Sequence, residues 1–414
     1  MTPPPRDAWV PPGCADLTNP DVFLDGPPHE TFRRLRAEAP VAWHPEAGGG
    51  GFWCVTRWQD VRTVSLDQRT FSSWRGGIML RDFPDDLLAA QRETITAMEP
   101  ARHAAHRKIV SAAFVPKVIR DLEPRLRTVT REILDGLGAR GTCDFVTDVA
   151  SELPVVAICE LLGIPHADRG KVVAWSNALV GMDDPEYAGT PEDGPVAAMQ
   201  VAMYAQALAE ERRREPRSDV ISRLLAADLD GERLSDGAFN AFVLVLSVAG
   251  NETTRNLIAG GLHALFEHPE ERARLQADLA LLPTAVEEML RWVTPVMYFR
   301  RTAERDVELT GRRIRAGDRV VMWYVSANRD EAVFERPDSF DVSRTPNDHL
   351  SFGFGSHFCL GASLAQLEAR VLFEELFGRY PEIAPAGPIA RMRANHIAGI
   401  KHMPVRFTRE RPAS

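Results

Sequence analysis

The stretch "SFGFGSHFCLG", residues 351–361, decides how this sequence is interpreted, because it places a single cysteine among glycines and aromatic residues. A free cysteine is most often a buried structural thiol. Here Gly353, Gly355 and Gly361 remove side chains, so the backbone can approach something flat and large. The pattern therefore indicates that Cys359 has a functional role, as a nucleophile or a metal ligand, and is not only a structural thiol.

Cys359 also comes just before an amphipathic helix predicted over residues 360–380. The positive end of a helix stabilises a thiolate, so the sequence predicts a lowered pKa for this thiol. A nucleophilic thiolate needs a nearby general base. His357 is only two residues away, but a histidine in a loop need not face its neighbour. A metal-binding thiolate with no second Cys or His at metal spacing suits haem iron, whose other ligands come from the porphyrin.

A second unusual stretch, "AGNETT" at 249–254, lies in the middle of an apolar run over 237–268. A helix that is apolar on all sides belongs in the centre of a protein, where an acid and two hydroxyls are costly. Glu252 and Thr253 point about 100° apart on such a helix. Ala249 and Gly250 leave room on one face, where a threonine hydroxyl bonded to a carbonyl or water could seat dioxygen above a haem. Alternatively the helix ends near 251 and "NETTRN" starts another.

Two further pairs have helical spacing. Glu288 and Arg291 are three residues apart, hence on one helix face. His103 and Arg107 are four apart and form a cationic strip suited to carboxylates. Taken alone, each pair is typical of an ordinary solvated surface.

The rest of the pattern predicts one mostly helical domain with small sheets over residues 1–414. Its expected parts are a Pro-rich arm (1–28), a short helix with a hairpin at the "GGGG" turn (29–70), a long functional loop (76–98), a helical region (100–292) with a loop at 181–197, and a hairpin region (296–326).

Composition excludes several classes. The 414 residues carry a net charge of −9 with no basic run, which argues against nucleic-acid binding. Five scattered cysteines exclude a disulfide scaffold and fit a reducing cytoplasm. The Pro-rich start does not resemble a signal peptide, and the longest apolar stretch, 241–250, is too short to cross a bilayer. We therefore expect a cytoplasmic protein without a membrane anchor.

Together these residues resemble the cytochrome P450 family of haem-thiolate monooxygenases. "FGFGSHFCLG" matches the haem-loop pattern FGxGxHxCxG, Glu288 to Arg291 matches ExxR, and "AGNET" matches the oxygen-activation pattern with Glu252 where aspartate is commoner. The motifs follow the family's order along the whole chain. The resemblance implies a mainly α fold with small β-sheets, in which a triangular prism of helices surrounds a buried haem b.

The resemblance also implies roles for individual residues. Cys359 becomes the axial thiolate, with Phe352 packed near the sulfur and Gly361 beside it. Thr253 and Glu252 deliver protons during oxygen activation, next to Ala249. The haem propionates are bound by His103, Arg107, Arg301 and His357. An ion network that fixes the loop contains Glu288, Arg291 and Arg336. The expected substrate contacts are the 76–98 loop, the helices around 168–205, Val248, Ala249, Val296, Met297 and the turn Ile397–Ile400.

Similarity to bacterial members implies O2-dependent hydroxylation of a small hydrophobic substrate, with electrons from a ferredoxin and an NAD(P)H-fed ferredoxin reductase. A basic docking patch is expected at Arg102, Arg107, Lys108 and Arg344. Stretches such as "VVMWYVSANRD" are similar to the actinobacterial branch that oxidises sterol side chains and branched lipids. Tailoring of a natural product, either free or carrier-bound, stays the alternative, because the 76–98 loop is polar for a sterol pocket. Peroxygenase and haem-sensor activities are the other classes considered.

Overall fold

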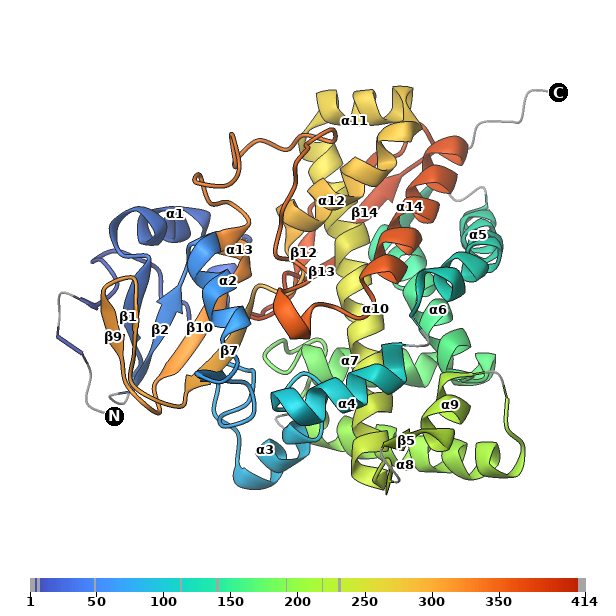
Figure 1. The fold of residues 1–414 in the computed structure, drawn as a ribbon. Helices are drawn as coiled ribbons and strands as arrows, with labels where there is room; N and C mark the ends of the chain where they lie inside the picture. The colour runs from blue at the N-terminus through green and yellow to red at the C-terminus, as the bar shows by residue number, and fades with distance from the viewer. Residues whose placement is uncertain are drawn as a thin grey trace.

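The computed structural model describes residues 4–5, 8–47, 50–111, 114–138, 141–190, 192–217, 219–229 and 232–408. Residues 1–3 and 6–7 of the expected arm, and glycines 48–49 of the expected turn, lie outside the described residues. Figure 1 shows a sheet-rich part, built from N-terminal segments and residues 298–323, beside a larger helical part crossed by α10 (Asp236–Glu267). The expected class, mainly α with small sheets, is confirmed.

Helix α10 is continuous over 32 residues, or about 48 Å at 1.5 Å per residue. Ser235 caps its start, since the side-chain oxygen accepts a hydrogen bond from the Ala238 N–H at 3.2 Å. The helix packs against α6, α7, α8, α12 and α14, whose bounds follow below. Because it passes unbroken through residue 251, the alternative of two helices meeting there is wrong.

The helices of the larger part lie around α10 on several sides, whereas α1, α2 and α13 lie in the sheet-rich part (Figure 1). Their bounds are α1 (His29–Glu38), α2 (Trp58–Leu66), α3 (Asp85–Arg92), α4 (Pro100–Ser111), α5 (Pro116–Leu137), α6 (Glu152–Leu162), α7 (Arg169–Val180), α8 (Asp193–Arg214), α9 (Val220–Ala226), α11 (Pro269–Ala277), α12 (Leu282–Val293), α13 (Tyr324–Ala327) and α14 (Ala362–Arg379).

Two loops predicted from the sequence are shorter than expected. The 76–98 segment contains α3, whose first turn carries Asp85 and Asp86, and acids there favour a helix. The loop predicted over 181–197 ends at residue 192, because the Asp-Gly-Pro sequence at 193–195 forms the first turn of α8. Proline and acidic residues are tolerated in a first turn, which composition alone does not distinguish from a loop.

The main sheet has the strand order β1-β2-β10-β7-β3 and joins distant parts of the sequence. Its strands are β1 (Val41–Pro45), β2 (Gly51–Val55), β3 (Phe71–Ser72), β7 (Tyr298–Ala303) and β10 (Arg319–Trp323). The predicted β1–β2 hairpin is confirmed, with Val41 paired to Val55, while β10 runs parallel to β2. The smaller strands are β4 (Thr142–Asp144), β5 (Asp228–Leu229), β6 (Glu232–Arg233), β8 (Val307–Leu309), β9 (Arg312–Ile314), β11 (Ala384–Pro385), β12 (Ala390–Arg391), β13 (Ile400–His402) and β14 (Pro404–Arg406).

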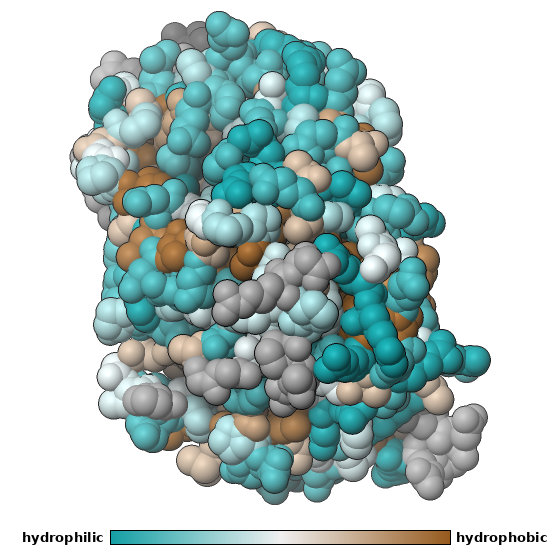
Figure 2. All heavy atoms as spheres, turned by 90° about the vertical axis from the view of Figure 1, so that its left-hand side faces the viewer, coloured by the Kyte–Doolittle hydropathy of each residue, from teal (hydrophilic) through white to brown (hydrophobic). Residues whose placement is uncertain are grey.

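The N-terminal arm packs onto this sheet-rich part. Leu17 and Phe23 are buried, and the Phe23 ring stacks on Trp323 of β10 at 6.3 Å between centroids. On the face shown in Figure 2, hydrophobic side chains form separate small patches between hydrophilic ones. Among the described residues, every helix falls short of the length and apolarity that a bilayer-spanning segment needs.

Candidate active site

The 351–361 loop forms a tight turn directly before α14. A single 3-10 turn (Gly355–His357) precedes Cys359, whose N–H donates to the Phe352 carbonyl at 2.8 Å. Gly353 and Gly355 have φ angles of +72° and +76°, which residues with a Cβ rarely adopt. Their backbone conformation thus explains these two glycines. A Cβ on Gly361 would meet no protein atom within 4 Å, so the fold leaves space there.

Cys359 has solvent-accessible surface, although many protein atoms surround its thiol. Burial raises its pKa, while the Gly361 N–H and the Arg107 charge act in the opposite direction. The expectation of a lowered pKa is therefore wrong for the protein alone, because desolvation outweighs the helix end. A metal ion that binds the sulfur displaces its proton.

Four cationic or titratable side chains from three segments gather beside this loop. The rings of His103 on α4 and His357 lie 4.2 Å apart between centroids. Burial, with the charges of Arg301, His103 and Arg107 close by, lowers the pKa of His357 to about 2. Burial also lowers the pKa of His103 to about 4. Four such groups close together are unfavourable unless negative charge joins them, and Glu99 supplies some of it to Arg301.

Arg301 gives the clearest sign of such an anion. Its side chain is buried, its Nη1 donates to the Arg300 carbonyl at 2.9 Å, and its Nε has no hydrogen-bond partner in the part of the chain that the structure describes. Burial lowers the pKa of Arg301, while the charges of Tyr324 and Glu99 act in the opposite direction. Two propionates would supply the missing negative charge and acceptors, so the residues present fit haem.

The middle of α10 presents the residues expected on the opposite side of a haem. The Thr253 hydroxyl donates to the Ala249 carbonyl at 2.6 Å, one turn back in the helix. Ala249 is exposed although it belongs to a central helix, so it borders an internal space. Gly250 does not contribute to that space as expected, because a Cβ there would meet the Ile158 side chain of α6 at 3.0 Å.

Glu252 lies on another face of α10 from Thr253. Its buried carboxylate is paired with Arg255 and accepts a hydrogen bond from Asn256 Nδ2 at 3.0 Å. Arg255 was not among the residues predicted from the sequence, although its i,i+3 spacing from Glu252 is a signal for such a pair.

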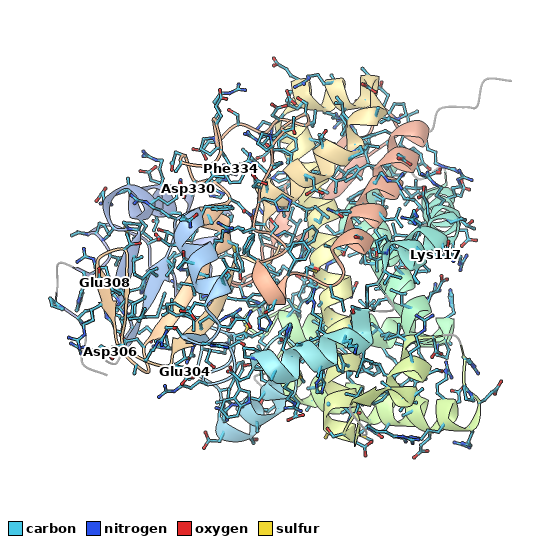
Figure 3. The ribbon with its side chains drawn as sticks, in the orientation of Figure 1. Lys117, Glu304, Asp306, Glu308, Asp330 and Phe334 are labelled. Carbon is cyan, nitrogen blue, oxygen red and sulfur yellow. The ribbon has the colours of Figure 1, made fainter. Side chains whose placement is uncertain are left out.

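The Glu288–Arg291 pair forms the centre of a buried network. Arg291 donates to both carboxylate oxygens at 2.8 and 2.7 Å, and both side chains have no exposed surface. The Phe334 ring, labelled in Figure 3, lies 5.4 Å from the Arg291 guanidinium. Arg291 also donates to the carbonyls of Asn328, Pro337 and Ser339, which ties the segment before the cysteine loop to α12.

The third arginine of this network is not the predicted one. Arg336 is exposed, whereas Arg344 donates to Glu288 Oε2 at 3.0 Å and has 9% of its side chain exposed. Arg336 has a φ of 47°, and its carbonyl accepts from Arg344, so its backbone takes part in the turn. No helical or strand spacing relates Glu288 to Arg344 across 56 residues, so the sequence carried no local signal for it.

The residues expected to contact substrate are partly brought together. Val296 and Ile397 form a β-bridge and share an apolar cluster with Met392 and Tyr187. Val248 on α10 is half-buried. Met297 instead is buried in a different cluster, with Tyr298 and Trp323. Phe352 is half-buried, its ring 6.0 Å from that of Phe358.

Comparisons with known proteins agree with this geometry. A cytochrome P450 family model matches residues 196–382. The steroid C26-monooxygenase of Mycobacterium tuberculosis (strain ATCC 25618 / H37Rv) is 40% identical over 98% of this chain and 95% of its own length. The methyl-branched lipid omega-hydroxylase of that strain is also 40% identical, over 98% of this chain and 97% of its own length.

A solved structure is similarly close. A Mycobacterium marinum cytochrome P450 in complex with pseudoionone has a TM-score of 0.87 and 42% identity, covering 92% of this chain and 94% of that one. The fold, the full-length identity and the cationic pocket beside a cysteine lead to one conclusion. This chain belongs to the cytochrome P450 family of haem-thiolate monooxygenases.

Proposed function

We propose that this protein hydroxylates a hydrophobic substrate of the steroid or methyl-branched lipid class, with Cys359 as the axial ligand of haem b. When bound, a thiolate-ligated haem supplies the activation of dioxygen that C–H hydroxylation needs. His103, Arg107, Arg301 and His357 hold its propionates, and the unpartnered Nε of buried Arg301 is the observation that carries this assignment.

Thr253 and Glu252 supply the protons that oxygen activation consumes. Thr253, held on the Ala249 carbonyl at 2.6 Å, presents its hydroxyl oxygen next to the internal space bordered by Ala249. Its oxygen keeps acceptor capacity while its proton is donated, so it orients a water or an oxygen ligand there. Glu252 is the acid closest in sequence and serves as the proton reservoir for that hydroxyl.

The substrate class rests on two supports. Two relatives at 40% identity over almost the whole chain are named for steroid and methyl-branched lipid oxidation. The predicted substrate residues Val296 and Ile397 lie in an apolar cluster with Met392 and Tyr187, which suits a hydrocarbon chain. These supports favour a free lipid over the carrier-bound natural product considered from the polar loop.

The test is ligand titration of the purified ferric protein. A steroid with an alkyl side chain and a methyl-branched fatty acid should each shift the Soret band to shorter wavelength. A carrier-bound acyl chain is the comparison. A shift only with the carrier-bound ligand would overturn the substrate class, and a reduced CO complex without the thiolate-type Soret band would overturn the assignment of Cys359.

The electron donor is proposed to be a ferredoxin fed by an NAD(P)H-dependent reductase. Of the docking patch expected from the sequence, Lys108 is exposed and Arg102 pairs with Glu93. Arg107 lies in the cationic pocket, and Arg344 has 9% of its side chain exposed within the network. A groove of about 440 Å³ between α5, α12 and α14 instead has exposed Arg120 on its wall.

Exposed Lys117, labelled in Figure 3, lies on the same turn of α5 as Arg120. Ser363, Gln366 and Leu367 of α14, which follows the Cys359 loop, form the opposite wall. An acidic iron–sulfur protein docked here would be close to the thiolate side. A cytoplasmic location completes the proposal and is supported by the small number and wide spacing of the five cysteines.

A further inference from the structure

The Glu252 carboxylate is held unevenly. One oxygen, Oε1, accepts hydrogen bonds from both Arg255 and Asn256, whereas the other, Oε2, is buried and has no hydrogen-bond partner among the described residues. An acid in the core that is half held and half unpartnered is costly. The arrangement therefore calls for an explanation beyond stability.

Arg255 connects this acid to another helix. Its side chain is buried, and its Nη1 donates to Asn177 Oδ1 on α7 at 3.0 Å while Nη2 binds Glu252. The guanidinium also lies 5.6 Å from the Tyr187 ring, which belongs to the apolar cluster of Ile397 and Val296. One planar, multidentate side chain thus joins α10, α7 and the segment after α7.

Asn256 makes a second connection. Its Nδ2 donates to Glu252 at 3.0 Å and its Oδ1 accepts from the Ile400 N–H at 3.4 Å. The turn that ends at Ile400 also carries Ile397, one of the proposed substrate contacts. Both groups that hold Oε1 are therefore fixed by segments on the substrate side.

We propose that Arg255 is a positioning residue for oxygen activation: braced by Asn177, it fixes Oε1 of Glu252 and leaves Oε2 as the oxygen that exchanges the proton. This inference rests on the role of Glu252 proposed above. Without Arg255 the carboxylate can turn about its side-chain bonds, so Oε2 no longer occupies one position. Proton delivery to the Thr253 side then becomes slower than loss of reduced oxygen as peroxide.

The test measures hydrogen peroxide released per NAD(P)H consumed, and substrate affinity from the spin-state shift, in six haem-loaded proteins. These are the wild type, Arg255→Ala, Arg255→Lys, Asn177→Ala, Glu252→Gln and the double variant Arg255→Ala/Glu252→Gln. Arg255→Ala and Glu252→Gln should each raise the peroxide fraction at least about threefold, since positioned acid–base groups contribute tenfold or more. Substrate affinity should change less than about twofold in Glu252→Gln. Arg255→Ala also removes the contact with Tyr187 of the apolar cluster, so its affinity is measured to separate that effect from the peroxide fraction.

The double variant gives the sharpest result. If Arg255 acts through Glu252, the double variant releases no more peroxide than the Glu252 single variant. Effects that multiply would overturn the proposal. An unchanged peroxide fraction in Glu252→Gln would instead sink the proposed role of Glu252 itself, which separates the two failures.

Arg212→Ala is the matched control. Arg212, on α8, is also a buried cation, and it pairs with Asp219 at 2.6 Å. It should lower thermal stability and leave the peroxide fraction unchanged. If Arg255→Ala does not bind haem, Asn177→Ala and Arg255→Lys decide. Both should raise the peroxide fraction, and wild-type coupling in both would overturn the proposal.

A crystal structure of haem-loaded protein adds a readout independent of turnover. It should show Oε1 of Glu252 bound to Arg255 in the wild type, and a rotated or disordered carboxylate in Asn177→Ala. An unchanged, ordered carboxylate in that variant would contradict the bracing role of α7.

Discussion

Glu288 and Arg291 form a doubly hydrogen-bonded ion pair with neither side chain exposed to solvent. The pair is satisfied on both sides, because Arg291 also binds three carbonyls and Glu288 accepts from Arg344, Asn347 and the Asp341 N–H. This pair also fixes the segment that leads into the cysteine loop. Arg291 donates to the Asn328 carbonyl, and the Asn328 side chain accepts a hydrogen bond from the Leu350 N–H, just before the loop.

Breaking this pair should therefore lower the free energy of unfolding of the protein strongly. Glu288→Gln is expected to lower the free energy of unfolding by about 3–5 kcal/mol, because it leaves buried Arg291 without its charge partner. Denaturant titration measures this value, with haem retention as a second signal. The matched control is Arg33→Ala, which breaks an exposed i,i+3 pair with Glu30 and should cost at most about 1 kcal/mol. Equal losses in both variants would contradict the importance of burial.

The third arginine of the network allows a direct comparison. Arg344→Ala should destabilise the protein by about 1–3 kcal/mol, because it removes a charged donor from buried Glu288. Arg336→Ala should stay within about 0.5 kcal/mol, because that side chain is exposed. Thermal unfolding of the two variants side by side distinguishes them. The reverse order would restore the assignment made from the sequence.

Thr253→Ala should divert reducing equivalents to peroxide while leaving substrate affinity almost unchanged. The reason is that alanine removes the hydroxyl held at 2.6 Å from the Ala249 carbonyl and keeps the helix intact. We expect a fall of about tenfold or more in product formed per NAD(P)H, in line with loss of a proton-transfer group. Thr253→Ser keeps the hydroxyl and is the control. If serine and alanine behave alike, the methyl group matters and the hydroxyl does not.

Charge reversal at the groove tests the electron-donor proposal. The double variant Lys117→Glu/Arg120→Glu should slow reduction by an acidic ferredoxin about tenfold at low ionic strength, with a smaller difference at high salt. Stopped-flow reduction under CO measures the rate. The control is Arg223→Glu on α9, which also reverses an exposed cation. A loss of equal size in the control would mean that overall charge, and not this groove, steers the donor.

His402 predicts a pH dependence on the alkaline side. Hydrogen bonds to Asp144 at 2.6 Å and Glu186 at 2.7 Å raise its pKa, with Lys401 and Asp184 nearby. A raised folded-state pKa means that the stabilisation is complete below the ordinary value near 6.5 and is lost as the pH rises through the raised value. Unfolding followed from pH 6 to 9 should show this decline, and His402→Asn should flatten it. A decline of the same size in the variant would assign it to other groups.

Local patterns in the chain were sufficient for most of the helical architecture. The 32-residue α10, the α12 helix and α14 follow from apolar periodicity, because long amphipathic or fully apolar segments leave few alternatives. Short elements were harder. Helix α3 and the first turn of α8 contain Asp, Gly and Pro, which are equally typical of loops, so only packing decides between the two structures.

By itself the sequence pointed to the residues for which we propose the chemistry: a cysteine in a glycine-rich loop, a threonine and an acid in a central helix, and a pair spaced as ExxR. Tertiary structure alone decided how they are paired. Arg344 replaces Arg336 on Glu288, and Arg255 with Asn177 holds Glu252. It also decided that burial raises the Cys359 pKa. Partners far apart in the chain and the degree of desolvation depend on packing in three dimensions, which no local spacing encodes.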